Sequence, residues 1–332
     1  MLANFIAWFT RSIVFGSVIM LGAIGETYTE KAGNLNLGTP GIMAIGAAAA
    51  FIGAFKYENS VQNPNVVLCI LIPLICAFAA SMLAGLLYTF LTVTLYANQN
   101  VTGLTLTIFG VGLAKFFGSY VIPTGSVSIA AAATNKVFSA NIQTATSGAL
   151  GNFGQLFLSY GFMMYAALVI AVLSSFILNR TRTGLNLRAI GENPATADAV
   201  GINVTKYKYL AITLGAGISG LGGAYYVLDF GNGIWSTATV TDIEAFGWLA
   251  VALVIFATWK PLNIIWGAYL FGLCYWAYQF LPAIIGIQIS TDISRMAPYV
   301  VTIIVLIIGS LRKKRENQAP SSIGVPYFRE DR

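Results

Sequence analysis

The sequence predicts an all-α fold, a polytopic membrane helical bundle of about nine transmembrane helices, with eight to ten compatible with its apolar runs. Of the 332 residues, 57% are hydrophobic and 9% are charged, and the mean hydropathy is +0.75. Several apolar runs are long enough to cross a hydrocarbon layer of about 30 Å. A polar segment, residues 180–208, lies between two of them. These observations together indicate a membrane protein.

The apolar runs define the expected spans. In chain order they lie at 12–25, 40–55, 66–96, 103–121, 159–178, 209–228, 245–259, 262–281 and 296–311. The first run follows Arg11, as a signal peptide would, but no small-residue cleavage site is found after it, so we expect an uncleaved span. The run 66–96 is long for one crossing, which favours a tilted or broken helix. We therefore expect a transmembrane domain over 1–311 and a basic tail over 312–332.

The first two spans are separated by a polar, glycine-rich stretch, Gly25–Gly41. Such backbone is costly in lipid and is tolerated at an aqueous face or along a cavity. Thr39 and Pro40 are typical of a helix cap followed by the first helical residue, with the positive end of the helix dipole directed into the stretch. Two interpretations stay open: a broken helix that handles substrate near the membrane midplane, and an ordinary loop before a capped helix.

The segment 180–208 contains five basic and two acidic residues, and short loops rich in Lys and Arg favour the cytoplasmic side. Asn193 followed by Pro194 predicts a helix cap and first helical residue, and Gly201 is expected to end that helix. A short helix on the inner membrane surface follows.

Small residues recur at every fourth position in the span that follows this loop. They form two lines, Gly215, Ser219 and Gly223 on one and Ala216, Gly220 and Ala224 on the other. Small residues let helix backbones approach closely, so we expect this helix at the centre of the bundle.

The charges predict an orientation. If the loop 180–208 and the cluster 312–315 are cytoplasmic, then Lys260 is inside as well, and the N-terminus is outside. Four acidic residues follow on the outer side: Asp229, Asp242, Glu244 and Asp292. Residues 122–154 form a long external connection. Twelve of the eighteen basic residues lie in the loop, at Lys260 or in the tail, so orientation in a bilayer explains the net charge of +6 better than nucleic-acid binding.

Enzymatic chemistry is disfavoured. The chain has no histidine, which removes the usual general base and the commonest metal ligand. Cys69, Cys76 and Cys274 lie in apolar runs without the spacing of a metal site or disulfide framework, so we interpret them as packing residues. No convergent set of nucleophile and base is found.

Three segments carry a resemblance to a known family. They are GETYTEKAGNLNLGTPGIMAIGA near the start, LRAIGENPATADAVGINVTKYKYLAITLGAGISGLGGAY in the middle and FATWKPLNIIWGAYLFG after it. Together they resemble the permease subunits of ABC importers, in the nucleoside and simple-sugar branch of the branched-chain amino acid and ribose permease superfamily. The resemblance runs from about Gly22 to Leu311.

The resemblance implies a non-catalytic permease in the plasma membrane whose central loop docks into an ATP-binding subunit. The chain has no Walker-type phosphate loop, so it binds no cofactor itself, and ATP and Mg belong to the partner. The coupling helix would comprise Glu192, Asn193, Pro194, Ala195, Thr196, Ala197, Asp198, Ala199, Val200 and Gly201. A second permease chain, which would be a different chain or a second copy, and an external substrate-binding protein complete the expected assembly.

Nucleosides are the expected substrate, through the family branch. Amides and hydroxyls suit hydroxylated ligands and aromatic faces suit a base, so the expected path residues are Asn34, Asn36, Thr105, Thr107, Phe109 and Trp248. Plain helix packing is the alternative for each. A simple-sugar permease, a branched-chain amino acid permease and a secondary transporter stay open. The last would need ionisable residues inside the spans, where the sequence places almost none.

Overall fold

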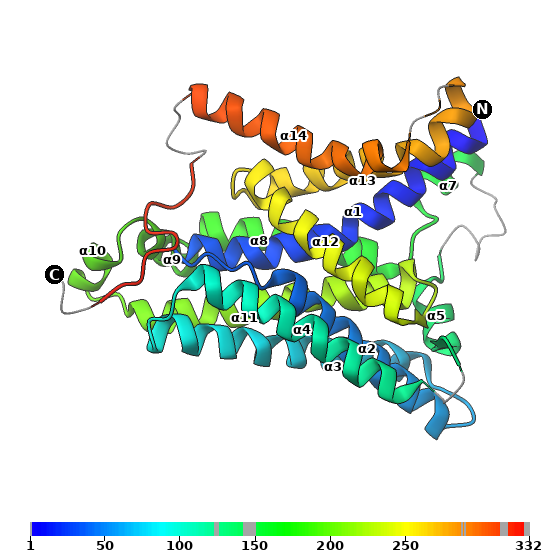
Figure 1. Ribbon diagram of the computed structural model, residues 1–332, viewed down its shortest axis with the longest axis horizontal. Helices are drawn as coiled ribbons and strands as arrows, with labels where there is room; N and C mark the ends of the chain where they lie inside the picture. The colour runs from blue at the N-terminus through cyan, green and yellow to red at the C-terminus, as the bar shows by residue number, and fades with distance from the viewer. Residues whose placement is uncertain are drawn as a thin grey trace.

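The computed structural model describes residues 2–122, 126–141, 151–286, 288, 290–312 and 318–328. Helices dominate the described chain (Figure 1). In order, the elements are α1 (Leu2–Lys31), α2 (Thr39–Ser60), α3 (Val66–Thr89), η1 (Phe90–Thr94), α4 (Gln99–Val121), β1 (Ile129–Ala130), α5 (Ala132–Phe138), α7 (Gly151–Phe157), α8 (Phe162–Arg180), α9 (Arg182–Glu192), α10 (Pro194–Ala199), α11 (Val204–Tyr225), η2 (Tyr226–Phe230), β2 (Ile234–Trp235), α12 (Thr237–Phe256), α13 (Pro261–Ile285) and α14 (Thr291–Arg312).

Within the described residues, eight helices are long and apolar enough to cross a membrane. They are Leu2–Lys31, Thr39–Ser60, Val66–Thr94, Gln99–Val121, Phe162–Arg180, Val204–Phe230, Thr237–Phe256 and Pro261–Ile284. The count lies in the expected range of eight to ten. The ninth expected span, 296–311, falls within α14, a helix of 22 residues that is not among the eight.

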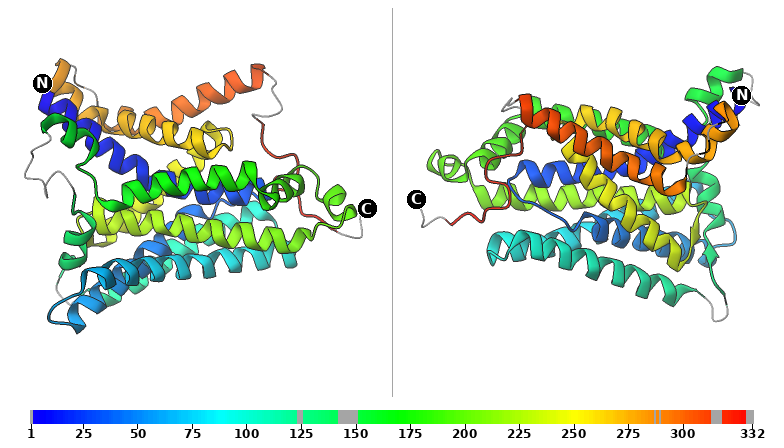
Figure 2. Two further views of the ribbon diagram at one scale, coloured as in Figure 1. Left: turned by 180° about the vertical axis from the view of Figure 1, so that it is seen from behind. Right: turned by 45° about the horizontal axis from the view of Figure 1, so that its top comes forward.

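The bundle has two ends (Figures 1 and 2). One carries α9 and α10 and is called the loop end here; the other carries α5 and α7 and is called the far end. Helices α1, α8, α12 and α14 run from the far end to the loop end, so Lys260, between α12 and α13, lies at the same end as α9 and α10. The predicted grouping of these loops at one end is confirmed, whereas the side of the membrane that each end faces stays a prediction.

Helix α11 packs centrally, against α1, α2 and α3. The hydroxyl of Ser219 donates a hydrogen bond of 3.1 Å to the carbonyl of Gly22 in α1. A side chain at Gly215 would meet the carbonyl of Gly25, and one at Gly223 would meet that of Met43. The small residues therefore bring α11 into backbone contact with α1 and α2, as the fourfold spacing predicts.

The expected break between the first two spans is shorter than the sequence indicates. Helix α1 continues through Glu26 and Glu30 to Lys31, so only residues 32–38 are non-helical. The expected cap at Thr39 is wrong: Gly38 occupies the cap position and Thr39 is already helical. Its hydroxyl donates to Glu26 instead. Pro40, predicted as the first helical residue, is the second and lies in the first turn.

The long run 66–96 forms one span. Helix α3 continues directly into the π-helical turn η1, and Pro73 lies inside α3. The structure therefore places one continuous crossing over this run, with a local widening of the helix at its end, so the expected break is wrong and the tilt stays a prediction.

The described part of the expected external connection lies at the far end. Strands β1 and β2 pair antiparallel, with Ile129 opposite Trp235. Glu58 of α2 accepts hydrogen bonds from the backbone nitrogens of Ala133 (3.2 Å) and Thr134 (2.6 Å), which begin α5. Residues 123–125 and 142–150 of this connection lie outside the described chain.

Candidate functional site

The segment 180–208 contains two short helices, α9 and α10, joined at Asn193, and its last five residues already belong to α11. Asn193 caps α10, because its side chain accepts a hydrogen bond of 3.0 Å from the backbone nitrogen of Thr196. Pro194 is in the first turn. Gly201 has a φ of +87°, a left-handed conformation that favours glycine, and follows the last turn. The predicted start and stop of this helix are confirmed, while α9 was not predicted.

Helix α10 exposes one side and packs with the other. Ala197 is buried against Ile190 and Val204, whereas Thr196, Ala199 and Val200 are exposed. An exposed side that combines a valine with small and hydroxyl side chains can seat against another protein without a large desolvation penalty.

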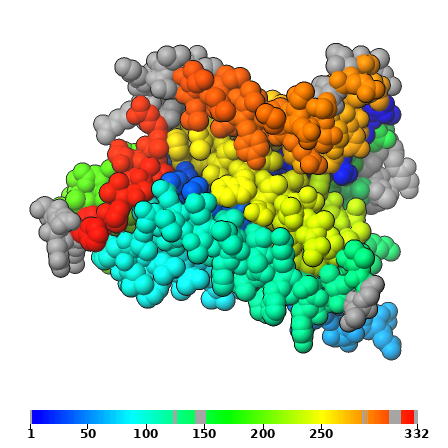
Figure 3. Space-filling view, in the orientation of Figure 1, coloured from blue at the N-terminus to red at the C-terminus, as the bar shows by residue number. Residues whose placement is uncertain are grey.

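The C-terminal strap, residues 318–328, lies across the loop end (Figure 3). Its Ser322 donates from the backbone nitrogen to the carbonyl of Gly191 (3.0 Å), and Ser321 donates to Glu192 (2.9 Å). Tyr327 donates to Asp198 (2.9 Å), and the Phe328 ring lies 4.5 Å from that of Tyr96. The expected tail is thus in part a packed element. The cluster 313–315 lies outside the described residues.

The junction of α9 and α10 also contacts the connection between α1 and α2. A side chain at Gly191 would meet the carbonyl of Lys31, and one at Gly33, whose φ is +81°, would meet Ser322 and Gly191. Three segments distant in sequence therefore meet at two glycines.

Two carboxylates lie buried beside that connection. Glu26, 1% exposed, accepts hydrogen bonds from the backbone nitrogen of Asn36 (3.2 Å) and from the Thr39 hydroxyl. Glu30, also 1% exposed, accepts from the indole nitrogen of Trp259. Ionisable residues thus do lie inside a span, contrary to the sequence-based placement of this stretch in a loop. Their hydrogen bonds connect α1 to the start of α2 and to the turn that follows α12.

The expected path residues divide into two groups. Asn34, Asn36 and Thr107 meet around the connection: Thr107 donates to the carbonyl of Leu37 (2.7 Å), and the Asn36 side chain accepts from Gly38 (2.9 Å). Asn34 is fully buried, and neither polar atom of its side chain has a partner among the described residues.

The other three candidates lie apart from that group. Thr105 and Phe109 line a mostly apolar pocket of about 320 Å³ on α3 and α4, with Phe109 49% exposed. Trp248 is partly exposed on α12. Their role in a path stays a prediction.

Sequence reasoning missed several groups of the loop end. These are Gln99 and Lys208, both buried, and the strap residues Ser322 and Tyr327. The Glu26–Glu30 pair had a sequence signal, since positions four apart share one helix face. The strap contacts join residues about 130 positions apart, and no local pattern announces them.

Comparison with known proteins identifies similar chains. The family model described as branched-chain amino acid transport system, permease component, matches residues 9–306. The chain is 30% identical to the guanosine ABC transporter permease protein NupQ of Bacillus subtilis over 96% of its length and 95% of the relative. It is also 30% identical to the nucleoside ABC transporter permease protein NupC of Lactococcus lactis, with the same coverage of both chains.

A third relative has a different printed substrate. The putative glucose ABC transporter permease protein TsgC13 of Haloferax volcanii is 34% identical over 77% of this chain and 72% of the relative. No solved structure matches the chain.

Proposed function

The chain belongs to the family of branched-chain amino acid transport system permease components, and from that premise we propose that it is the membrane subunit of an ATP-driven nucleoside importer. One observation carries the substrate: two relatives named for guanosine and nucleoside permeases are similar over 96% of this chain. The glucose relative matches a smaller part, 77%. A simple-sugar importer is therefore the second candidate.

The buried charges fit a neutral substrate better than an amino acid. An amino acid's ammonium and carboxylate require opposite charges along the path. Glu26 and Glu30 are enclosed and engaged by Thr39, Asn36 and Trp259. They are thereby occupied in joining helices, which favours an uncharged ligand with hydroxyls over a branched-chain amino acid.

In this proposal α10 docks on a separate ATP-binding subunit that binds ATP and Mg. Residues 192–201 form the coupling helix, with Asn193 and Pro194 setting its start and Gly201 its end. Closure of the ATPase pair would push α10, and the contact of Gly191 with Lys31 and Gly33 would pass the movement to α1 and α2. These helices pack on α11 through small residues, so the bundle can shift between two packed arrangements.

The same proposal defines the remaining partners. The loop end would face the cytoplasm and the far end would receive an external substrate-binding protein. Helices α3, α4 and α8 expose many large apolar side chains, among them Leu83, Ile108, Phe116 and Phe176. Such faces suit the lipid bilayer and a second permease chain.

Transport by the reconstituted complex tests the proposal. The permease, with its ATPase and second permease, is placed in proteoliposomes with the binding protein, and entry of labelled guanosine, adenosine and uridine is measured. We expect uptake that needs ATP, that unlabelled nucleosides compete with, and that leucine and ribose leave unchanged. Complexes given a non-hydrolysable ATP analogue are the control. Saturable uptake of ribose or leucine without competition by nucleosides would reject nucleosides as the substrate, while the proposal of an ATP-driven importer would stand.

A further inference from the structure

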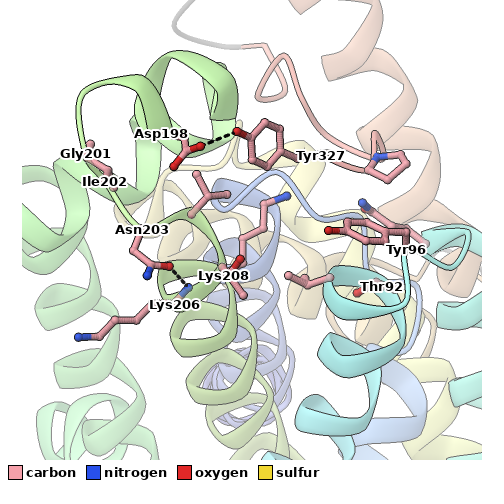
Figure 4. Close-up of a pocket in the computed structure, with 14 residues that line it drawn as sticks. Thr92, Tyr96, Asp198, Gly201, Ile202, Asn203, Lys206, Lys208 and Tyr327 are labelled. Atoms are coloured by element: carbon pink, nitrogen blue, oxygen red, sulfur yellow. Dashed lines mark hydrogen bonds between the residues drawn. The ribbon is translucent and has the colours of Figure 1, made fainter. Parts of the chain in front are cut away.

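A polar pocket of about 610 Å³ opens at the loop end (Figure 4). Its walls come from the turn between α3 and α4, the link between α10 and α11, and the C-terminal strap. The volume lies in the range of small-molecule sites, roughly 300–1,000 Å³. The coupling helix contributes Asp198 and Gly201 to the wall, so an occupant would touch the segment proposed to dock on the ATPase.

Lys208 provides the first sign of a ligand. It lies in the second turn of α11, is 3% exposed and reaches into the pocket between Tyr96 and Tyr327 (Figure 4). Its ammonium has no hydrogen bond or ion pair within the described chain. A buried charge without a partner costs several kcal/mol, as an order of magnitude, so this site calls for a negative group.

Gln99 provides the second sign. It is 3% exposed and lines the same pocket, and its side-chain oxygen accepts from the backbone nitrogen of Leu35 (2.7 Å). That bond fixes the amide, and its nitrogen has no partner in the parts of the chain that the structure describes. Two buried donors from two helices therefore border one pocket without acceptors.

The other charged side chains that line the pocket, Asp198 and Lys206, do not pair with Lys208. Asp198 accepts a hydrogen bond from Tyr327 at the strap side (2.9 Å). Lys206 also lines the pocket, but it is exposed, and in Figure 4 its side chain extends away from Lys208. The start of α11, which lines the pocket from Val204 onward, adds the positive end of a long helix. Together these features favour an oxyanion.

We propose that this pocket binds the phosphate group of a nucleoside monophosphate. Lysine ammonium, an amide donor and a helix N-terminus are groups that recognise phosphate. The rings of Tyr96 and Tyr327 on opposite sides of Lys208 offer faces for a base. The choice of a nucleotide rests on the proposed function. Transfer of the γ-phosphoryl group of a nucleoside triphosphate to the hydroxyl of an imported nucleoside, with release of the diphosphate and a proton, would produce this ligand on the side where the pocket opens. A bound nucleotide would hold α10 against the strap, which makes the site suited to feedback by the imported product.

Binding to the purified full-length chain tests the site without transport. The chain is placed in phosphatidylcholine nanodiscs and titrated with labelled guanosine or uridine monophosphate, with inorganic phosphate or unphosphorylated nucleoside as competitors. We expect saturable binding of the monophosphate, weaker competition by phosphate, and at least about tenfold weaker competition by the nucleoside, since the charge-assisted bonds are lost. Failure of this binding leaves the transport assay unaffected, so the two proposals are separable.

Variants locate the site. Lys208→Met should weaken monophosphate binding at least about tenfold, Gln99→Leu several-fold, and Lys208→Arg should retain it. Lys206→Met is the matched control, since it removes the same charge two residues away, and should leave affinity within about twofold. Equal loss in Lys206→Met and Lys208→Met, or no binding by the wild-type chain, overturns the proposal.

The lipid headgroup is the other source of phosphate. Nanodiscs containing phosphatidylglycerol are therefore compared with phosphatidylcholine ones. Undiminished monophosphate binding supports a soluble ligand. If phosphatidylglycerol displaces the monophosphate, and this displacement is lost in Lys208→Met, the pocket binds a lipid headgroup. That result would overturn the proposal that it binds a nucleotide.

Discussion

The hydroxyl of Tyr327 donates a hydrogen bond of 2.9 Å to Oδ2 of Asp198, which ties the C-terminal strap to helix α10 across 129 positions of sequence. The backbone nitrogen of Ser322 in the same strap donates a hydrogen bond to the carbonyl of Gly191, and the Phe328 ring packs against that of Tyr96. Helix α10 is thus held on one side by the strap. Its contacts therefore include residues outside the loop that contains it.

Tyr327→Phe removes that bond and little else. We expect a local loss of about 1 kcal/mol, the usual net value of a hydrogen bond, and so roughly fivefold faster hydrogen exchange in 194–199. Tyr120→Phe, at a tyrosine 85% exposed, is the control and should change nothing. Unchanged exchange in Tyr327→Phe would show that the strap does not stabilise α10.

Gly201→Val should impair coupling. The φ of +87° is strained for a β-branched side chain, by about 1–3 kcal/mol, so α10 would lose its stop. We expect intact membrane insertion and ATPase activity that no longer responds to substrate, and the same for Pro194→Gly. Gly201→Asn is the matched variant, because asparagine adopts positive φ more readily. Normal uptake by Gly201→Val and Pro194→Gly would contradict the coupling role.

Gly215→Leu should destabilise the whole bundle. A side chain there would meet the carbonyl of Gly25, and overpacking costs about 1–3 kcal/mol or more where backbone must move. The thermal midpoint of the detergent-purified chain should fall. Gly112→Leu, where an added side chain meets nothing within 4 Å, should leave it unchanged. Equal midpoints would show that α11 and α1 can separate freely.

Trp259→Phe should also lower stability, because Glu30 loses the indole donor while it stays buried. The expected cost is about 1–3 kcal/mol. Trp266→Phe, at a tryptophan 78% exposed, is the control. The loss should shrink when Glu30 is first replaced by leucine. An equal loss in both backgrounds would mean that the indole acts by packing alone.

Cysteine labelling tests the orientation. After replacement of Cys69, Cys76 and Cys274, a cysteine at Val127, which is 85% exposed at the far end, should react with a membrane-impermeant maleimide in intact cells. A cysteine at Thr196 should react only after permeabilisation. The reverse pattern would overturn the assignment of the loop end to the cytoplasm.

Much of the architecture was predictable because it depends on local patterns. Apolar run length placed the eight candidate spans, since the hydrocarbon thickness sets the length a helix needs. Asn193, Pro194 and Gly201 predicted the limits of α10, because capping and positive φ are properties of single residues. The fourfold spacing of Gly215, Ser219 and Gly223 predicted a central helix, because one face of a helix is periodic.

Only the tertiary structure decided where polar residues belong. The stretch containing Glu26 and Glu30 is loop-like by composition, yet it is helical and buried because Thr39 and Trp259 satisfy its carboxylates. Lys208 and Gln99 border one pocket although 109 positions separate them, and Tyr327 reaches Asp198 over a longer interval. Such pairings are absent from local sequence, because a buried polar group is stabilised by whichever partner the fold brings to it.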